Sequence, residues 1–241
     1  MAIDGALEER LAFLETLGAT SFFDIEPGSA LSGDDAALEP LGLSAVAQST
    51  FAAAIEQVTA LGAVAAGHGS LASSFGLLHG ALEAAAVTIW LLESDDPLER
   101  GVRLLSEAWG EIREAEAMLA ALGGAADEIT GAREAVWLEA HRSRFGPVET
   151  RPFQKRTPIA EKIRVASVVV AAFTETADYT AIIPSGWRGF DSISQGRGES
   201  FGLVDDASSS AMVAGSLAML LDVLETAASL FHSRAVADTA I

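Results

Sequence analysis

The sequence contains no cysteine and few lysines or aromatic residues. Without cysteine, disulfides, thiolate nucleophiles and cysteine-ligated zinc or iron–sulfur centres are excluded. Lysine occurs only at Lys155 and Lys162, and aromatic residues make up 7% of the 241 residues. Alanine is the commonest residue, and valine, isoleucine and aromatic residues do not form alternating runs. This composition favours closely packed helices over a strand-rich fold.

Long uncharged apolar runs and a secretory signal pattern are also missing. The longest apolar stretches, around 84–92 and 165–173, reach about half of the roughly 18 residues that a membrane span needs. The first ten residues have no positive region followed by an apolar core. We therefore expect a cytoplasmic protein that does not contact a membrane.

Positive charge is scarce: 15 basic residues face 34 acidic ones, for a formal net charge of −19. A surface this negative repels nucleic acid unless its cations gather in one place, so nucleic acid is not an expected partner. The alanine-rich, arginine-over-lysine usage indicates a high-GC bacterial source.

Complete motifs for metal binding or nucleophilic catalysis do not occur. Di-metal helical bundles need Glu-x-x-His pairs, and the sequence has none. There is also no G-x-S-x-G elbow and no α/β pattern to hold one. We predict no metal, no cofactor and no catalytic residues.

Helical periodicity predicts one all-α domain over 1–241, a bundle of about seven helices, with a soft boundary at 145–157 as the alternative. Between 20 and 42 we expect at most one helical turn, near Ala36, and between 178 and 208 a long glycine-rich loop. Four of the predicted helices span 4–17, 44–66, 97–122 and 210–232. Of the other three, one ends near 92, one ends near 144 and one begins at 158.

The helix predicted at 97–122 has apolar residues in alternating steps of four and three, which indicates a bundle seam. The seam residues are Leu98, Val102, Leu105, Trp109 and Ile112. Its glutamates, among them Glu107 and Glu111, are expected on the solvated face.

Glu83 is the only charged residue between Ala81 and Leu92, so we expect its carboxyl group to be buried or nearly so, and paired, hydrogen-bonded or protonated. His79 lies one helical turn before it, and Arg100 and Arg103 share a face of the next helix. These four residues form a predicted buried polar cluster. Its role is either an ion pair that fixes the register of two helices, or a ligand or catalytic site.

Seven of the 15 basic residues lie between 142 and 164. This basic segment either binds phosphate or another anion, or neutralises the acidic helices of the chain itself. The predicted anion-binding residues are Arg142, Arg144, Arg151, Lys155 and Arg156.

The predicted loop at 178–208 contains GRGES at 196–200, which lacks the spacing of a dinucleotide motif and the lysine of a phosphate loop. Its Trp187, Phe190 and Phe201 either anchor the loop on the bundle or belong to a lid over a cavity near Glu83.

The stretch from His79 to Arg103 combines a helix centred on Glu83, a Trp90-Leu91-Leu92 end and a start at Pro97 with Arg100 and Arg103. It resembles a pattern in uncharacterised all-helical actinobacterial proteins, and covers about a tenth of the chain. Such proteins invite comparison with the helical ribonuclease domains called HEPN, which use an arginine followed by a histidine after four to six residues. Arg133 and His141 are the nearest pair here, and seven residues separate them. A ribonuclease is therefore not our first choice.

Two functions follow as hypotheses. The first is a non-enzymatic helical protein that self-associates or binds a protein partner, because alanine-rich seams are abundant and no catalytic set is complete. The alternative is a small-ligand or nucleotide-handling enzyme, related to defence systems or toxins, with a site between Glu83 and the 178–208 loop.

Overall fold

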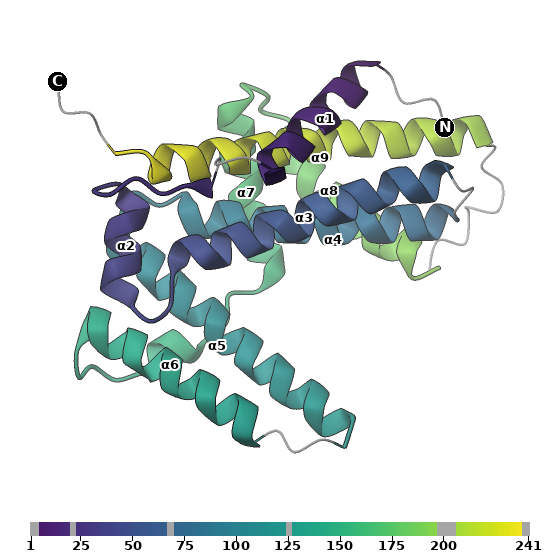
Figure 1. The fold of residues 1–241 in the computed structure, drawn as a ribbon. Coiled ribbons are helices and arrows are strands. Elements are labelled where there is room, and N and C mark those ends of the chain that lie inside the picture. Colours follow the sequence, from purple (N-terminus) through teal and green to yellow (C-terminus); the bar gives the residue numbers. More distant parts are fainter. Residues whose placement is uncertain (1–4, 20–22, 67–69, 124–126, 197–205, 238–241) are drawn as a thin grey trace. The chain divides into compact units, whose positions relative to one another are not determined.

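The computed structural model describes residues 5–19, 23–66, 70–123, 127–196 and 206–237. Within these ranges the regular structure is helical and contains no strand, which confirms the all-α bundle (Figure 1). The elements are α1 (Gly5–Ala19), α2 (Ala30–Leu38), α3 (Leu43–Ala66), α4 (Leu71–Leu92), α5 (Pro97–Ala121), α6 (Asp127–Phe145), the 3₁₀ turn η2 (Arg151–Gln154), α7 (Ile159–Phe173), α8 (Tyr179–Ser194) and α9 (Asp206–Ala235).

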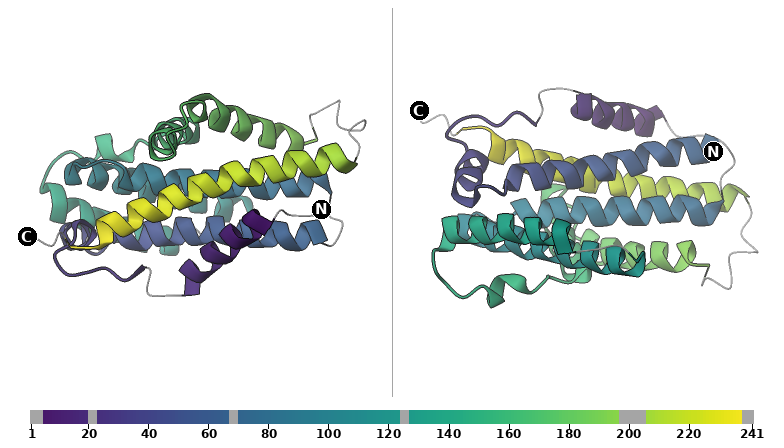
Figure 2. Two further views of the ribbon diagram at one scale, coloured as in Figure 1. Left: turned by 90° about the horizontal axis from the view of Figure 1, so that it is seen from above. Right: turned by 60° about the horizontal axis from the view of Figure 1, so that its bottom comes forward.

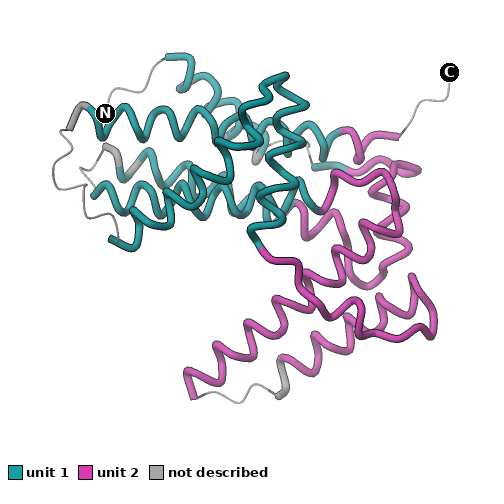
Figure 3. Tube along the Cα trace, turned by 180° about the vertical axis from the view of Figure 1, so that it is seen from behind, with its two compact units in different colours: residues 1–24, 48–90, 159–232 teal, residues 25–47, 91–158, 233–241 magenta. Residues whose placement is uncertain are grey.

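The chain divides into two compact units (Figure 3). Unit 1 comprises Met1–Asp24, Gln48–Trp90 and Ile159–His232, and unit 2 comprises Ile25–Ala47, Leu91–Pro158 and Ser233–Ile241. The chain passes from unit 2 back to unit 1 just after the predicted soft boundary at 145–157. The single domain over 1–241 stays a prediction.

Unit 1 is built around α3, α4 and α9, which run side by side, with α1 on one side of them and α8 on the other (Figure 2). The helical stripes predicted from the sequence supply its core. Leu14 of α1, Phe51 of α3 and Leu220 of α9 are almost completely buried in one hydrophobic cluster. Buried leucine, alanine and phenylalanine side chains from α4, α7 and α8 complete it.

Unit 2 has a small core that is rich in aromatic rings. Trp137 of α6 is fully buried, and its Nε1 donates to the Leu105 carbonyl oxygen at 2.7 Å. Its ring lies 4.9 Å from that of Trp109 and 5.6 Å from that of His141. Burial, with a smaller contribution from Arg142, lowers the pKa of His141 below its ordinary 6.5.

The corner before α5 has residue types that favour the start of a helix. Asp96 is the N-cap and accepts from the Leu98 backbone N–H at 2.8 Å, while Pro97 occupies the first turn. Behind the corner, the Arg100 guanidinium donates from Nε to Asp34 of α2 at 2.7 Å and from Nη1 to the Ser94 carbonyl oxygen at 2.8 Å. Arg100 and Asp34 have 3% and 2% of their side chains exposed, so this ion pair ties α2 to the corner inside unit 2.

Two segments expected to be irregular are helices. Tyr179–Ser194 forms α8, although it contains Pro184 and two glycines, because Ile183, Trp187 and Phe190 recur at helical spacing and all pack on the core of unit 1. Ala30–Leu38 forms α2, where Ser29 caps the first turn and Leu31 and Leu38 are buried. The rest of the predicted glycine-rich loop, at 197–205, including Phe201 and most of GRGES, lies outside the described residues.

The predicted seam of α5 is partly wrong. Leu105 and Ile112 are buried, but Leu98 and Val102 are 53% and 36% exposed. The buried face is instead centred on Arg100, Gly101 and Leu104, because the charged Arg100 turns inward to meet Asp34.

Two helical stretches, Leu71–Leu92 and Ser208–Ala235, are long and apolar enough to cross a membrane by length and composition, contrary to the expectation from the uncharged apolar runs. Within the described chain, 67% and 56% of their apolar windows are buried. Core helices of soluble proteins have the same character. The cytoplasmic location and the absence of membrane contact stay predictions.

The Asp34–Arg100 pair generates the first prediction. The Arg100→Met substitution leaves an uncompensated buried carboxylate and is expected to lower the free energy of unfolding by about 3–5 kcal/mol. The double variant with Asp34→Leu removes both charges and is expected to recover most of that loss. Urea unfolding followed by far-UV circular dichroism measures both. A double variant no more stable than Arg100→Met would contradict this account of the pair.

Candidate functional site

Glu83 of α4 lies against α8 in unit 1. Its Oε1 accepts a hydrogen bond from Trp187 Nε1 at 2.9 Å and lies 3.5 Å from His79 Nε2. The imidazole of His79 stacks on the Trp187 ring, with centroids 5.9 Å apart and planes 15° apart. One turn earlier on α4, Phe75 contacts Phe190. Phe75 therefore pairs with Phe190 and His79 with Trp187, so residue numbers increase along α4 as they decrease along α8. The two helices are antiparallel.

The predicted polar cluster is divided by the structure. His79 and Glu83 come together as expected, but Arg100 pairs with Asp34, and Arg103 with Glu93 at 2.7 Å and Glu99 at 2.5 Å. The side chain of Glu83 is 34% exposed, so its carboxylate is hydrogen-bonded as expected but only partly buried. The reason is that an indole N–H, 104 residues away in the chain, supplies its partner at the edge of the core.

Arg156, the last of the predicted anion-binding residues, is bound to the acidic face of α5. Its guanidinium contacts Glu107 at 3.1 Å and also contacts Glu114. Glu107 is buried, which corrects its predicted place on the solvated face. Gly110 lies between these glutamates, and a Cβ there would stand 2.6 Å from Arg156 Cδ. Because Gly110 has no side chain, the side chain of Arg156 can cross α5 at this position.

The other residues of the basic segment are spread out. Arg142 and Arg151 are exposed and only loosely paired, at 3.9 Å from Glu139 and 3.8 Å from Glu149. Lys155 is exposed, while its backbone carbonyl accepts from Ser106 at 2.6 Å. Arg144 is half-buried, and its Nε has no hydrogen-bond partner among the described residues. Anion binding by these four residues stays a prediction, whereas Arg156 neutralises an acidic helix.

One polar network was not anticipated from the sequence. Arg10 of α1 contacts both Asp222 and Glu225 of α9 at 2.6 Å, and the hydroxyl of Tyr179 donates to the other oxygen of Asp222. Burial, followed by the hydrogen bond to Asp222, raises the pKa of Tyr179 to about 12. The network holds α1 and the start of α8 on α9. Helical spacing of Asp222 and Glu225 was its only sequence signal.

Sharing of one arginine between two carboxylates recurs in the described chain. Four guanidinium groups each contact two acidic side chains, and several of these contacts join different helices. The four are Arg10 with Asp222 and Glu225, Arg103 with Glu93 and Glu99, Arg113 with Glu116 and Glu134, and Arg156 with Glu107 and Glu114.

A groove of about 380 Å³ runs between α8 and α9 in unit 1. None of the described residues that line it carries a charge. Three of its described lining residues are glycines, and a Cβ placed on two of them, Gly189 and Gly215, would meet nothing within 4 Å. Ile182 and Met212 at its rim are 46% and 36% exposed. Missing side chains on two helices therefore leave an open apolar hollow.

Comparison of the chain with protein-family models, with curated proteins and with solved structures gives no match in any of the three. The resemblance to actinobacterial helical proteins therefore stays a prediction. Within the described ranges, no three histidine, aspartate or glutamate side chains gather closely enough to hold a metal ion.

The contact between Glu83 and Trp187 generates the second prediction. Glu83→Leu leaves the indole N–H without an acceptor and is expected to cost about 1–2 kcal/mol of stability. Glu83→Gln keeps a carbonyl acceptor and is expected to cost less than half as much. Denaturant unfolding of both variants decides this. Equal losses would show that the charge of Glu83, and not its role as an acceptor, holds α8.

Gly110 generates the third prediction, with Gly131 of α6 as its matched control. A Cβ at Gly131 meets nothing within 4 Å, so Gly131→Ala is expected to stabilise the protein by about 0.5–1 kcal/mol through helix propensity. Gly110→Ala is expected to lose that gain, because the new methyl group displaces Arg156. In an Arg156→Ala background the gain returns. Equal stabilisation by both single substitutions in urea unfolding would contradict the proposed path of Arg156.

Proposed function

We propose that the chain acts without catalysis, as a helical protein that self-associates through the groove between α8 and α9. The observation that carries this proposal is an uncharged, glycine-lined hollow on a chain whose net charge is −19. Two copies that meet at this surface desolvate no charged group of the lining, so the largest cost of association is avoided there. A contact through other, acidic faces would bring like charges together.

The groove also suits a two-fold symmetric contact. In such an interface the same patch is used by both copies, so a projection on one must fit a hollow on the other. Ile182 and Met212 at the rim are the projections, and the backbone at Gly189 and Gly215 forms the hollow. Met212 and Met219 are flexible side chains that adapt to irregular gaps.

The alternative hypothesis, a nucleotide-handling enzyme with a site near Glu83, is less well supported by the contacts there. The Glu83 carboxylate already accepts a hydrogen bond from Trp187. Of the segment expected to act as a lid, Tyr179–Ser194 is a packed helix, and 197–205 lie outside the described residues. These contacts favour a role in positioning α8 over acid–base chemistry.

Light scattering after size exclusion tests the proposal and is the fourth prediction. Wild type is expected to form dimers more readily as salt rises, because the screening length falls from ~30 Å at 0.01 M to ~8 Å at 0.15 M and weakens repulsion between the copies. Gly215→Gln places a side chain in the hollow at a position where an added Cβ meets nothing within 4 Å, and it is expected to abolish dimers while leaving thermal unfolding intact.

The matched control is Gly62→Gln on α3, where a Cβ also meets nothing within 4 Å and the position lies outside the groove. This variant is expected to dimerise like wild type. A wild type that is monomeric at every salt concentration would overturn self-association. Dimers that persist in Gly215→Gln would place the interface elsewhere.

A further inference from the structure

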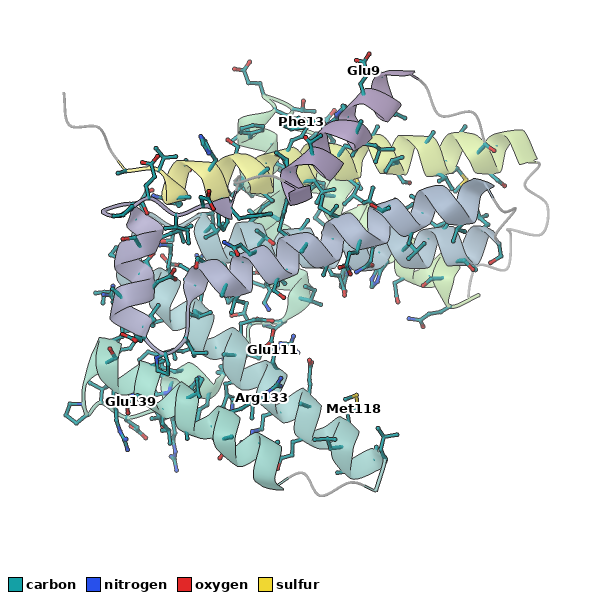
Figure 4. All side chains as sticks on the ribbon, in the orientation of Figure 1. Glu9, Phe13, Glu111, Met118, Arg133 and Glu139 are labelled. Carbon is teal, nitrogen blue, oxygen red and sulfur yellow. The ribbon has the colours of Figure 1, made fainter. Side chains whose placement is uncertain are left out.

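A second cavity, unrelated to the groove, lies in unit 2 between α5 and α6. It has a volume of about 300 Å³, at the lower end of the ~300–1,000 Å³ found for small-molecule sites. Its walls are apolar and are formed chiefly by Leu41, Ile112, Val136 and Trp137. Two charged residues complete the lining: Glu111 on α5 and Arg133 on α6, both labelled in Figure 4.

Neither of these charged side chains forms a hydrogen bond or an ion pair with a described residue. Four arginines in the described chain each contact two carboxylates, yet Arg133 forms no hydrogen bond or ion pair with any described residue. The same holds for the Glu111 carboxylate. They line one cavity and act on each other electrostatically, but they do not close into a salt bridge. Opposite charges that line one apolar cavity without pairing with each other can each pair with a group of a bound molecule.

The electrostatic surroundings of Glu111 support this reading. Although much of the side chain reaches water, burial raises the pKa of the carboxyl above its ordinary 4.5, and the nearby Glu107 raises it further. Arg133 and Arg156 act in the opposite direction and Glu114 adds to the repulsion. A ligand cation at Glu111 would relieve the repulsion between these carboxylates.

Net charge limits the ligand class. An anion would be repelled by a chain of net charge −19, and a simple cation would be repelled locally by the guanidinium of Arg133. A zwitterion carries no net charge and satisfies both groups at once. We infer that the cavity binds a small zwitterion with an apolar body, of which a hydrophobic α-amino acid is the simplest. Its ammonium group pairs with Glu111, its carboxylate with Arg133, and its side chain lies against the apolar walls.

Calorimetric titration with three related probes tests this inference and is the fifth prediction. Phenylalanine carries both charges, phenethylamine lacks the carboxylate, and 3-phenylpropanoate lacks the ammonium. Phenylalanine is expected to bind with a Kd of ~1 mM or tighter, and each analogue at least about 10-fold more weakly. Leucine and tryptophan extend the series to other side-chain sizes.

Two variants assign each charge to its residue. Glu111→Gln is expected to weaken binding of phenylalanine and phenethylamine and to spare 3-phenylpropanoate. Arg133→Gln is expected to weaken binding of phenylalanine and 3-phenylpropanoate and to spare phenethylamine. The matched control is Glu139→Gln, an exposed charged position on α6 outside the cavity, which should leave all affinities unchanged. Thermal unfolding checks that each variant is folded.

The pH dependence gives a second readout. Only the ionised Glu111 carboxylate attracts an ammonium group, so affinity for phenylalanine should rise with pH as Glu111 ionises, over a range in which both groups of the ligand stay charged. The charged groups that face this carboxylate are Glu107 and Glu114 on α5, Arg133 on α6 and Arg156 after η2. In Glu111→Gln the dependence should disappear.

No binding of phenylalanine, leucine or tryptophan at ~10 mM, well above the expected Kd, would overturn the inference. Equal effects of the two variants on all three probes would also overturn it, because the charges would then have no separate roles. Self-association, measured on the same samples, involves neither residue and does not decide the outcome.

Discussion

Excess negative charge is the constraint to which much of this structure responds. With 34 acidic and 15 basic residues, the chain cannot give every carboxylate its own cation. Arginines at helix contacts are therefore shared: Arg10 joins α1 to two carboxylates of α9, and Arg156 crosses α5 to reach two more. The buried pair of Asp34 and Arg100 depends more on its own contact, because neither group has water as an alternative partner.

Local signals in the sequence predicted the parts of the fold that depend on neighbouring residues. The cap at Asp96 with Pro97, the apolar stripes of α3 and α9, and the pairing of His79 with Glu83 all follow from spacings of one helical turn or less. Partners from distant parts of the chain were not predictable in this way. Nothing near Arg100 indicates that Asp34 will meet it 66 residues away.

The error over α8 has a different origin. Glycines and Pro184 suggested a loop, but the stripe of Ile183, Trp187 and Phe190 outweighs them once α4 offers a surface to bury it. The same glycines then leave the groove beside α9. Residues that weaken a helix in isolation thus shape a surface in the folded protein, and both candidate binding surfaces arise from contacts that no single segment of sequence contains.

The forked arginine contacts bear on how this protein can evolve. A lysine presents one compact charge, whereas the planar guanidinium of Arg10 or Arg156 reaches two carboxylates in fixed directions. Exchange of arginine for lysine is often accepted on protein surfaces. At these positions the exchange would leave one carboxylate of each pair without a cation in contact. The near absence of lysine from the sequence is thus consistent with selection for geometry as well as with base composition.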